Sequence, residues 1–203
     1  MKFARLLVLA LASCADAPRA PATEVVRYLR MPKMSLECSF STLRDADGWT
    51  ITSVTGPLTV EARYDASDRL LDARVALRDG KTARVDHDVD VPRGVIVTSA
   101  PDWTDTFRIC RLWDRARGGR QEFPGLWIHP VQPTQRLTFA AEFVRRDGEL
   151  DVVAIRLRGN SPYRAWVDPT GRMIKLVSLP VKEGSTVLVL QGFESAATAL
   201  PDE

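Results

Sequence analysis

Apolar and polar residues alternate along most of the chain beyond residue 35. Turn-forming residues interrupt this alternation about every 8–12 residues. A period of two is typical of β-strands that bury one face, because successive side chains point to opposite sides of a sheet. The pattern therefore predicts an antiparallel meander of about ten strands. The expected strands are residues 35–43, 49–54, 58–65, 69–78, 82–91, 95–99, 137–146, 150–158, 163–168, 172–177 and 186–191.

Three hairpins can be given a register from the sequence, and the first joins residues 69–78 to residues 82–91. A two-residue turn would set apolar side chains opposite polar ones, which a sheet with one buried face does not tolerate. A three-residue loop over residues 79–81 restores the match, with Gly80 at positive φ. The expected pairs are Leu77 with Ala83, Val75 with Val85, Ala73 with His87, and Leu71 with Val89.

The second hairpin is expected to turn at residues 147–149 and the third at residues 169–171. In the third, Gly171 supplies the positive φ of the turn. Asp168 and Arg172 should then pair at its mouth. The expected pairs of the second hairpin are Phe143 with Val153, Ala141 with Ile155, and Phe139 with Leu157.

One segment, residues 99–119, departs from the alternation. Its large apolar side chains recur at helical spacing at Trp103, Phe107, Cys110 and Trp113. Asp102 is the expected N-cap and Gly118 the expected stop signal. We expect a helix over residues 103–116, and a strand that places Ile109 on the same face as two of the aromatic residues remains the alternative.

Together these elements predict a mainly-β fold. The expected architecture is a strongly curved antiparallel meander, either a half-barrel or a barrel, with one helix packed on or in its concave face. A chain of 203 residues with 45% apolar residues is long and apolar enough for one domain with a substantial core.

The N-terminal segment has the three-part pattern of a secretory signal. Lys2 and Arg5 precede an uninterrupted apolar run over residues 6–12, and small residues follow. This run is too short to span a bilayer. Residues 11–14, Leu-Ala-Ser-Cys, resemble the lipobox of bacterial lipoproteins, in which the cysteine becomes the acylated first residue of the mature chain.

The lipobox resemblance implies a signal over residues 1–13, a lipid on Cys14, a tether over residues 14–24 and a single β domain over residues 25–203. Because Ala15 rather than aspartate follows the cysteine, the sorting signal resembles that of outer-membrane lipoproteins. Contact with the membrane would then run through the lipid anchor. Simple secretion without lipidation and a cytosolic location remain alternatives.

The combination of lipobox, strand meander and single helix is similar to the periplasmic half-barrel folds, which include lipoprotein-carrier and glycolipid-binding families. The resemblance is one of architecture. It implies a curved sheet around a helix and leaves the activity open.

Charge gives no reason to expect a nucleic-acid partner. The chain has 28 basic and 26 acidic residues. Lys2 and Arg5 lie in the expected signal, so its removal leaves 26 basic residues against 26 acidic ones. A neutral mature chain is drawn neither to nucleic acid nor to anionic lipid in bulk.

The three cysteines fit an exported protein. If Cys14 carries the lipid, Cys38 and Cys110 remain as a pair. An oxidising periplasm permits a disulfide between them, and two buried thiols are the alternative.

Motifs for catalysis and cofactor binding are missing from the sequence. There is no Gly-x-Ser-x-Gly, and Ser161 is followed by Pro162, which has no N–H to offer an oxyanion hole. His87 lies among aspartates, but in a strand it points away from them, so one metal ion cannot take all of these side chains. We expect no cofactor, no metal site and no catalytic residue.

Residues 115–133 hold the strongest candidate for a binding surface. Arginines surround two glycines, aromatic residues follow, and three prolines are expected to keep the run out of central strands. Such a basic lip beside an aromatic patch suits an amphiphile with an anionic head and an acyl body. A connector between the helix and the second half of the sheet is the alternative. The candidate rim residues are Trp113, Arg117, Arg120, Trp127 and His129.

These observations favour an exported lipoprotein without catalytic activity that binds a lipid, an acyl chain or another apolar or amphiphilic ligand. A structural or assembly lipoprotein that contacts other envelope proteins is the first alternative. An envelope hydrolase that uses His87 or His129 is the second.

Overall fold

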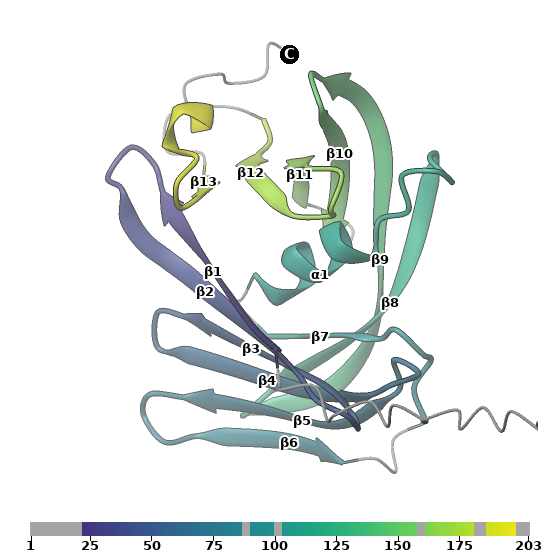
Figure 1. The fold of residues 1–203 in the computed structure, drawn as a ribbon. Helices are drawn as coiled ribbons and strands as arrows, with labels where there is room; N and C mark the ends of the chain where they lie inside the picture. The colour runs from purple at the N-terminus through teal and green to yellow at the C-terminus, as the bar shows by residue number, and fades with distance from the viewer. Residues whose placement is uncertain (1–21, 87–89, 100–102, 158–160, 181–185, 198–203) are drawn as a thin grey trace, which may run out of the picture.

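The protein, described here by a computed structural model, is mainly β as expected. The structure describes residues 22–86, 90–99, 103–157, 161–180 and 186–197. These residues form one 13-stranded sheet, one α-helix and one short 3-10 helix. The sheet is open and curves strongly, with the helix in its concavity (Figure 1).

The first half of the sheet is a meander of strands that each pair antiparallel with the next. Its strands are β1 (Ala22–Arg30), β2 (Ser35–Arg44), β3 (Gly48–Thr55), β4 (Leu58–Asp65), β5 (Leu70–Leu77) and β6 (Thr82–Asp86). The sequence interpretation missed β1, and the tether expected over residues 14–24 overlaps its start. A strand forms there because Val26 and Tyr28 alternate with polar residues and are buried in the core.

The second half contains the helix and the remaining strands. Its elements are β7 (Ile96–Thr98), α1 (Thr104–Leu112), β8 (Arg120–His129), β9 (Gln132–Asp147), β10 (Leu150–Leu157), β11 (Ser161–Val167), β12 (Met173–Ser178), β13 (Val187–Leu190) and the 3-10 helix η1 (Glu194–Ala197). Strands β8 to β13 form a second antiparallel meander.

The two meanders join where β1 pairs antiparallel with β13. The order across the sheet is therefore β6-β5-β4-β3-β2-β1-β13-β12-β11-β10-β9-β8-β7, with β6 and β7 at its edges. Curvature brings these edges back toward each other, since β6 contacts β8 and β7 contacts β4. In Figure 1 the meanders form opposite walls of a bowl, and α1 lies between them.

One strand pair departs from the expected antiparallel pattern. Strand β7 runs parallel to β8, with Ile96 opposite Gly125 and Thr98 opposite Trp127. Parallel neighbours need a crossover connection, and α1 supplies it. The helix connects these two strands of the same sheet, and this connection runs inside the bowl.

The run around residues 120–129 is strand β8, and residues 125–127 pair with both β7 and β9, so the expectation that prolines keep this run out of central strands is wrong. Pro124 fits because its φ suits an extended chain and because β7 pairs only with the three residues that follow it. Pro133 lies near the start of β9, where the missing N–H costs little.

The first hairpin is present, but its register differs from the expected one by two residues. Val75 pairs with Ala83 and Ala73 with Val85. The loop is residues 78–80, because Gly80, at φ 89°, takes its last position. A shift of two keeps the same side chains on the buried face. The expected pairs that involve His87 and Val89 lie outside the described residues.

The third hairpin has its expected geometry, whereas the second has its expected pairing but a two-residue turn at residues 148–149 in place of residues 147–149, because Asp147 pairs with Leu150. In the second, Phe143 pairs with Val153 and Ala141 with Ile155, and a bulge next to this pairing adjusts the strands toward the turn. In the third, the Arg172 Nε lies 3.0 Å from the Asp168 Oδ2 at the mouth of the turn.

Helix α1 confirms the helical interpretation of its segment, and the strand alternative is wrong. It ends at Leu112, short of the expected end at residue 116, and the chain is already extended at Trp113, with ψ 117°. Trp103 occupies the N-cap position. Asp102, the expected N-cap, lies outside the described residues.

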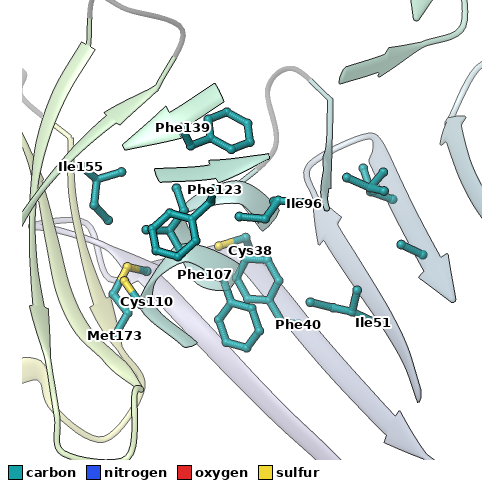
Figure 2. Close-up of a cluster of buried hydrophobic side chains, with 14 of the residues drawn as sticks. Cys38, Phe40, Ile51, Ile96, Phe107, Cys110, Phe123, Phe139, Ile155 and Met173 are labelled. Atoms are coloured by element: carbon teal, nitrogen blue, oxygen red, sulfur yellow. The ribbon is translucent and has the colours of Figure 1, made fainter. Parts of the chain in front are cut away.

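Buried apolar side chains from both meanders and from α1 form one continuous core that fills the bowl. In its centre, shown in Figure 2, the rings of Phe40 and Phe107 are stacked with centroids 4.4 Å apart. The described helices include none long and apolar enough to cross a membrane.

Candidate functional site

The fold does not bring all of the residues expected to form a ligand rim together. Arg120 and His129 are the two ends of β8, a ten-residue strand, and so lie roughly 30 Å apart. Trp113 and Trp127 are buried, and Arg117 and Arg120 are exposed. His129 is half-buried, and its ring is stacked on Trp127 with centroids 5.4 Å apart.

The described cysteines are buried thiols, so the expected disulfide is not formed and its alternative is observed. Cys38 lies on β2 and Cys110 on α1 (Figure 2). Burial raises the pKa of the Cys110 thiol far above its ordinary value, which makes it a poor nucleophile at neutral pH. Cys14 lies outside the described residues.

A cavity of about 400 Å³ opens between α1, strands β1 to β3 and the turns that follow β4 and β11. Its lining mixes arginine and acidic side chains with apolar ones. The lining residues are Glu24, Thr42, Arg44, Trp49, Ile51, Ala66, Asp68, Phe107, Arg108, Arg111, Leu112 and Thr170. We call this cavity the arginine pocket.

Strand alternation and helical spacing place these side chains. Thr42 and Arg44 follow the buried Phe40 on the inward face of β2, and Trp49 precedes the buried Ile51 on the inward face of β3. The residues from α1 lie one turn apart on the face that looks toward these strands. The turn after β11 packs against the helix, since a Cβ at Gly171 would lie 3.3 Å from the Cys110 carbonyl.

Arg108 is the most buried charged residue of the arginine pocket, with only 8% of its side chain exposed. Its guanidinium carbon lies 4.2 Å from the ring centroid of Trp49 and 5.1 Å from that of Tyr64. These two rings are themselves stacked, 4.2 Å apart. Cation–π contact with the stack holds the guanidinium in one orientation.

Arg108 keeps unused hydrogen-bond donors despite its burial. Its Nε and Nη2 atoms are buried and have no hydrogen-bond partner. The Asp68 carboxylate is the nearest anion, but its Oδ1 lies 3.6 Å from Nη2, beyond hydrogen-bonding distance. Burial lowers the pKa of the guanidinium, yet arginine stays protonated in proteins. The arginine pocket thus contains a buried cation whose hydrogen-bond donors are not all satisfied.

The two other arginines lie nearer the solvent. Arg111 forms an ion pair with Glu24 and lies over the ring of Phe107, 5.4 Å from its centroid. Arg44 is exposed, and it forms no ion pair with another described residue. The lining therefore has three arginines against two carboxylates, a net positive charge that favours an anionic ligand.

The sequence interpretation did not single out Arg108. A signal was present, because Arg108 and Arg111 lie between apolar residues of a segment whose helix was expected to pack into the core. A charged residue at a buried helical position usually has a partner or a ligand. The strand positions of Arg44 and Trp49 could be read from the alternation, but their meeting with the helix could not.

Among the residues that the structure describes, no three His, Cys, Asp or Glu side chains gather in a way that could hold a metal ion. The lining of the arginine pocket contains no histidine and no cysteine. Its side chains can contribute charge, hydrogen bonding and apolar contact.

Comparison with known proteins gives one neighbour of known structure. A crystal structure of a DUF1089 family protein from Pseudomonas aeruginosa is 22% identical, covers 84% of this chain and 95% of that chain, and has a TM-score of 0.38. No family model matches the chain. No curated protein matches it either.

Proposed function

We propose that the protein is an exported, outer-membrane-anchored lipoprotein that binds an amphiphilic ligand in the arginine pocket and does not transform it. The N-terminal signal and the lipobox-like Cys14 support export and anchoring. The arginine pocket carries the binding half of the proposal. Its volume of about 400 Å³ lies in the range of small-molecule sites.

The two kinds of lining match the two parts of an amphiphile. The apolar part of the lining consists of Ile51 and Phe107, which are buried, and the half-buried Leu112, and each ligand methylene buried against it contributes about 0.8 kcal/mol. Arg108 and Arg111 provide positive charge beside it. The apolar side chains would contact the acyl part of the ligand, and the arginines would bind its anionic part.

The test is recovery of a ligand from the full-length protein purified from membranes, by native mass spectrometry and by lipid extraction. Thr42→Trp places a large ring in the arginine pocket and should remove the ligand. Ser41→Trp, on the opposite face of the same strand, is the matched control and should keep it. Absence of ligand from the wild type, or equal recovery from both variants, would contradict the proposal.

Lipidation is tested separately by the mass of the mature N-terminus. An acylated Cys14 supports the anchor, and Cys14→Ser should then release the protein from the membrane fraction. An unmodified mature chain that starts after residue 14 would show simple secretion instead.

A further inference from the structure

Resting on the proposed function, we infer that Arg108 is the head-group receptor of the arginine pocket. It binds one anionic group, a carboxylate or a phosphate monoester. Two oxygens of this group accept hydrogen bonds from the Nε and Nη2 atoms of Arg108. Asp68 occupies part of the same position in the ligand-free protein and competes with the ligand for it.

The two unpartnered donors define the shape of the ligand group. In a guanidinium, Nε–H and the N–H of Nη2 point in the same direction along one edge of the plane. This edge matches two oxygens of a carboxylate or phosphate, which accept two parallel hydrogen bonds. In the ligand-free protein both atoms are closed to solvent and have no hydrogen-bond partner, so the anion reaches them only when Asp68, which also lines the cavity, moves aside.

The surroundings of Arg108 contact its guanidinium without providing a hydrogen bond to either donor. Both rings of the stacked Trp49–Tyr64 pair contact the guanidinium, whose carbon lies 4.2 Å from the Trp49 centroid and 5.1 Å from the Tyr64 centroid. The Tyr64 hydroxyl donates to the Val95 carbonyl over 2.9 Å, which anchors the stack. Because an unsatisfied buried donor is costly, a ligand that satisfies two donors at once gains both hydrogen bonds and relief of that cost.

In the ligand-free protein the Asp68 carboxylate lies near the position proposed for the anion. Its carboxylate lies 3.6 Å from Nη2, and 35% of the side chain is exposed, so it can move away. Its backbone holds a left-handed conformation, φ 66°, which asparagine also adopts readily. Asp68→Asn therefore removes the competing charge and leaves the turn intact.

The experiment is calorimetric titration of the full chain with four probes: dodecanoate, dodecyl phosphate, dodecanol and inorganic phosphate. We expect the two anionic amphiphiles to bind at least about tenfold more tightly than the neutral alcohol, as hydrogen bonds to charged groups predict. The ratio of dodecanoate to dodecyl phosphate shows which anion the pocket prefers. Equal affinity for dodecanol and both anions would overturn the inference and leave the proposed function standing.

Variants test the residue assignments. Arg108→Lys keeps the charge but loses the paired donors, so it should weaken dodecyl phosphate about tenfold or more and leave dodecanol unchanged. Arg63→Lys, an exposed change on β4, is the control. Asp68→Asn should strengthen binding of both anionic amphiphiles several-fold, and weaker binding by this variant would contradict its competing role.

Two outcomes separate the inference from the proposed function. If inorganic phosphate binds as tightly as dodecyl phosphate, the result supports the Arg108 assignment and contradicts the proposal that the ligand is an amphiphile. Failure of all four probes would overturn both. If Arg108→Lys does not fold, the probe series on the wild type and the Asp68→Asn variant still decide the inference.

Discussion

At the scale of single residues, Gly125 explains why β8 and β9 can pack as they do. A Cβ at this position would lie 2.4 Å from Cε2 of Phe139, and the three nearest atoms all belong to that ring. The Phe139 side chain is fully buried and covers the backbone of Gly125. The glycine in the run Phe-Pro-Gly-Leu-Trp therefore has a packing role.

Gly125→Ala should destabilise the protein by about 1–3 kcal/mol, because the added methyl group overpacks a filled core. Urea unfolding measures the change. Phe139→Leu in the same chain should recover part of the loss, since it removes the ring that the methyl group meets. Strictly additive losses in the double variant would show that the two side chains do not collide.

Two buried tyrosines each join distant parts of the chain through one hydrogen bond. The Tyr28 hydroxyl donates to the Met173 carbonyl over 2.8 Å, and the Tyr64 hydroxyl donates to the Val95 carbonyl over 2.9 Å. Burial raises the pKa of Tyr64 to about 12 and also raises that of Tyr28. Both hydroxyls are therefore neutral donors at physiological pH.

These pKa shifts predict a loss of stability in alkali. A group whose pKa is raised in the folded state stabilises fully below its unfolded pKa of about 10, and this contribution is lost as the pH rises through the folded pKa. Urea unfolding from pH ~8 to ~11 should thus show falling stability above pH ~10. Tyr64→Phe should make the decline less steep, and an unchanged slope would contradict the assignment.

At the scale of elements, hairpins are where the sequence was most informative. Alternation fixes which face is buried, so Val75 and Ala83 were placed correctly on the same face. Their register depends on which position of the loop Gly80 occupies. Gly80 takes the last position, and the observed register therefore differs from the expected one by two residues. The rarity of proline in central strands argues against strand β8, but Pro124 lies just before the pairing with β7 begins at Gly125.

The turn between β11 and β12 depends on Asp168, whose carboxylate accepts hydrogen bonds from the Thr170 backbone N–H, the Thr170 hydroxyl, the Arg172 backbone N–H and Arg172 Nε. Burial acts to raise its pKa, but these hydrogen bonds outweigh burial, and the pKa is lowered overall. Thr170 also lines the arginine pocket, so this turn is part of its wall.

Asp168→Ala should lower stability at pH ~7 by about 1–2 kcal/mol through loss of these hydrogen bonds. A group with a lowered folded pKa contributes above its unfolded pKa, about 3.9, and loses the contribution as pH falls through the folded value. The difference between wild type and variant should therefore shrink in acid. Urea unfolding at neutral and acidic pH measures it, and a constant difference would contradict this account.

At the scale of the whole molecule, the decisive contacts join residues far apart in sequence. The arginine pocket takes side chains from β1, β2, β3, α1 and two turns, and local patterning cannot reveal that these meet. The parallel pairing of β7 with β8 and the pairing of β1 with β13 are equally non-local. Local patterns could therefore predict a curved meander with an inner helix, but they could not predict the strand pairings and pocket contacts between distant parts of the chain.

The pairing of β1 with β13, together with the shared core, should make the two meanders unfold as one unit. Val189 is fully buried in β13 and pairs with Leu29 of β1 and Lys175 of β12. Val189→Pro removes a strand N–H at this junction and should cost at least about 1–3 kcal/mol, because a buried carbonyl loses its hydrogen bond. Val189→Ala, which loses only volume, is the control.

Amide hydrogen exchange distinguishes one cooperative unit from two. If the bowl is held together at this junction, Val189→Pro should lower protection by the same free energy in β4 and in β10, although neither strand pairs with β13. Both strands bury their inward side chains in the same continuous core, so neither half retains a complete core alone. Protection lost in β10 but kept in β4 would show instead that the first meander is independently stable.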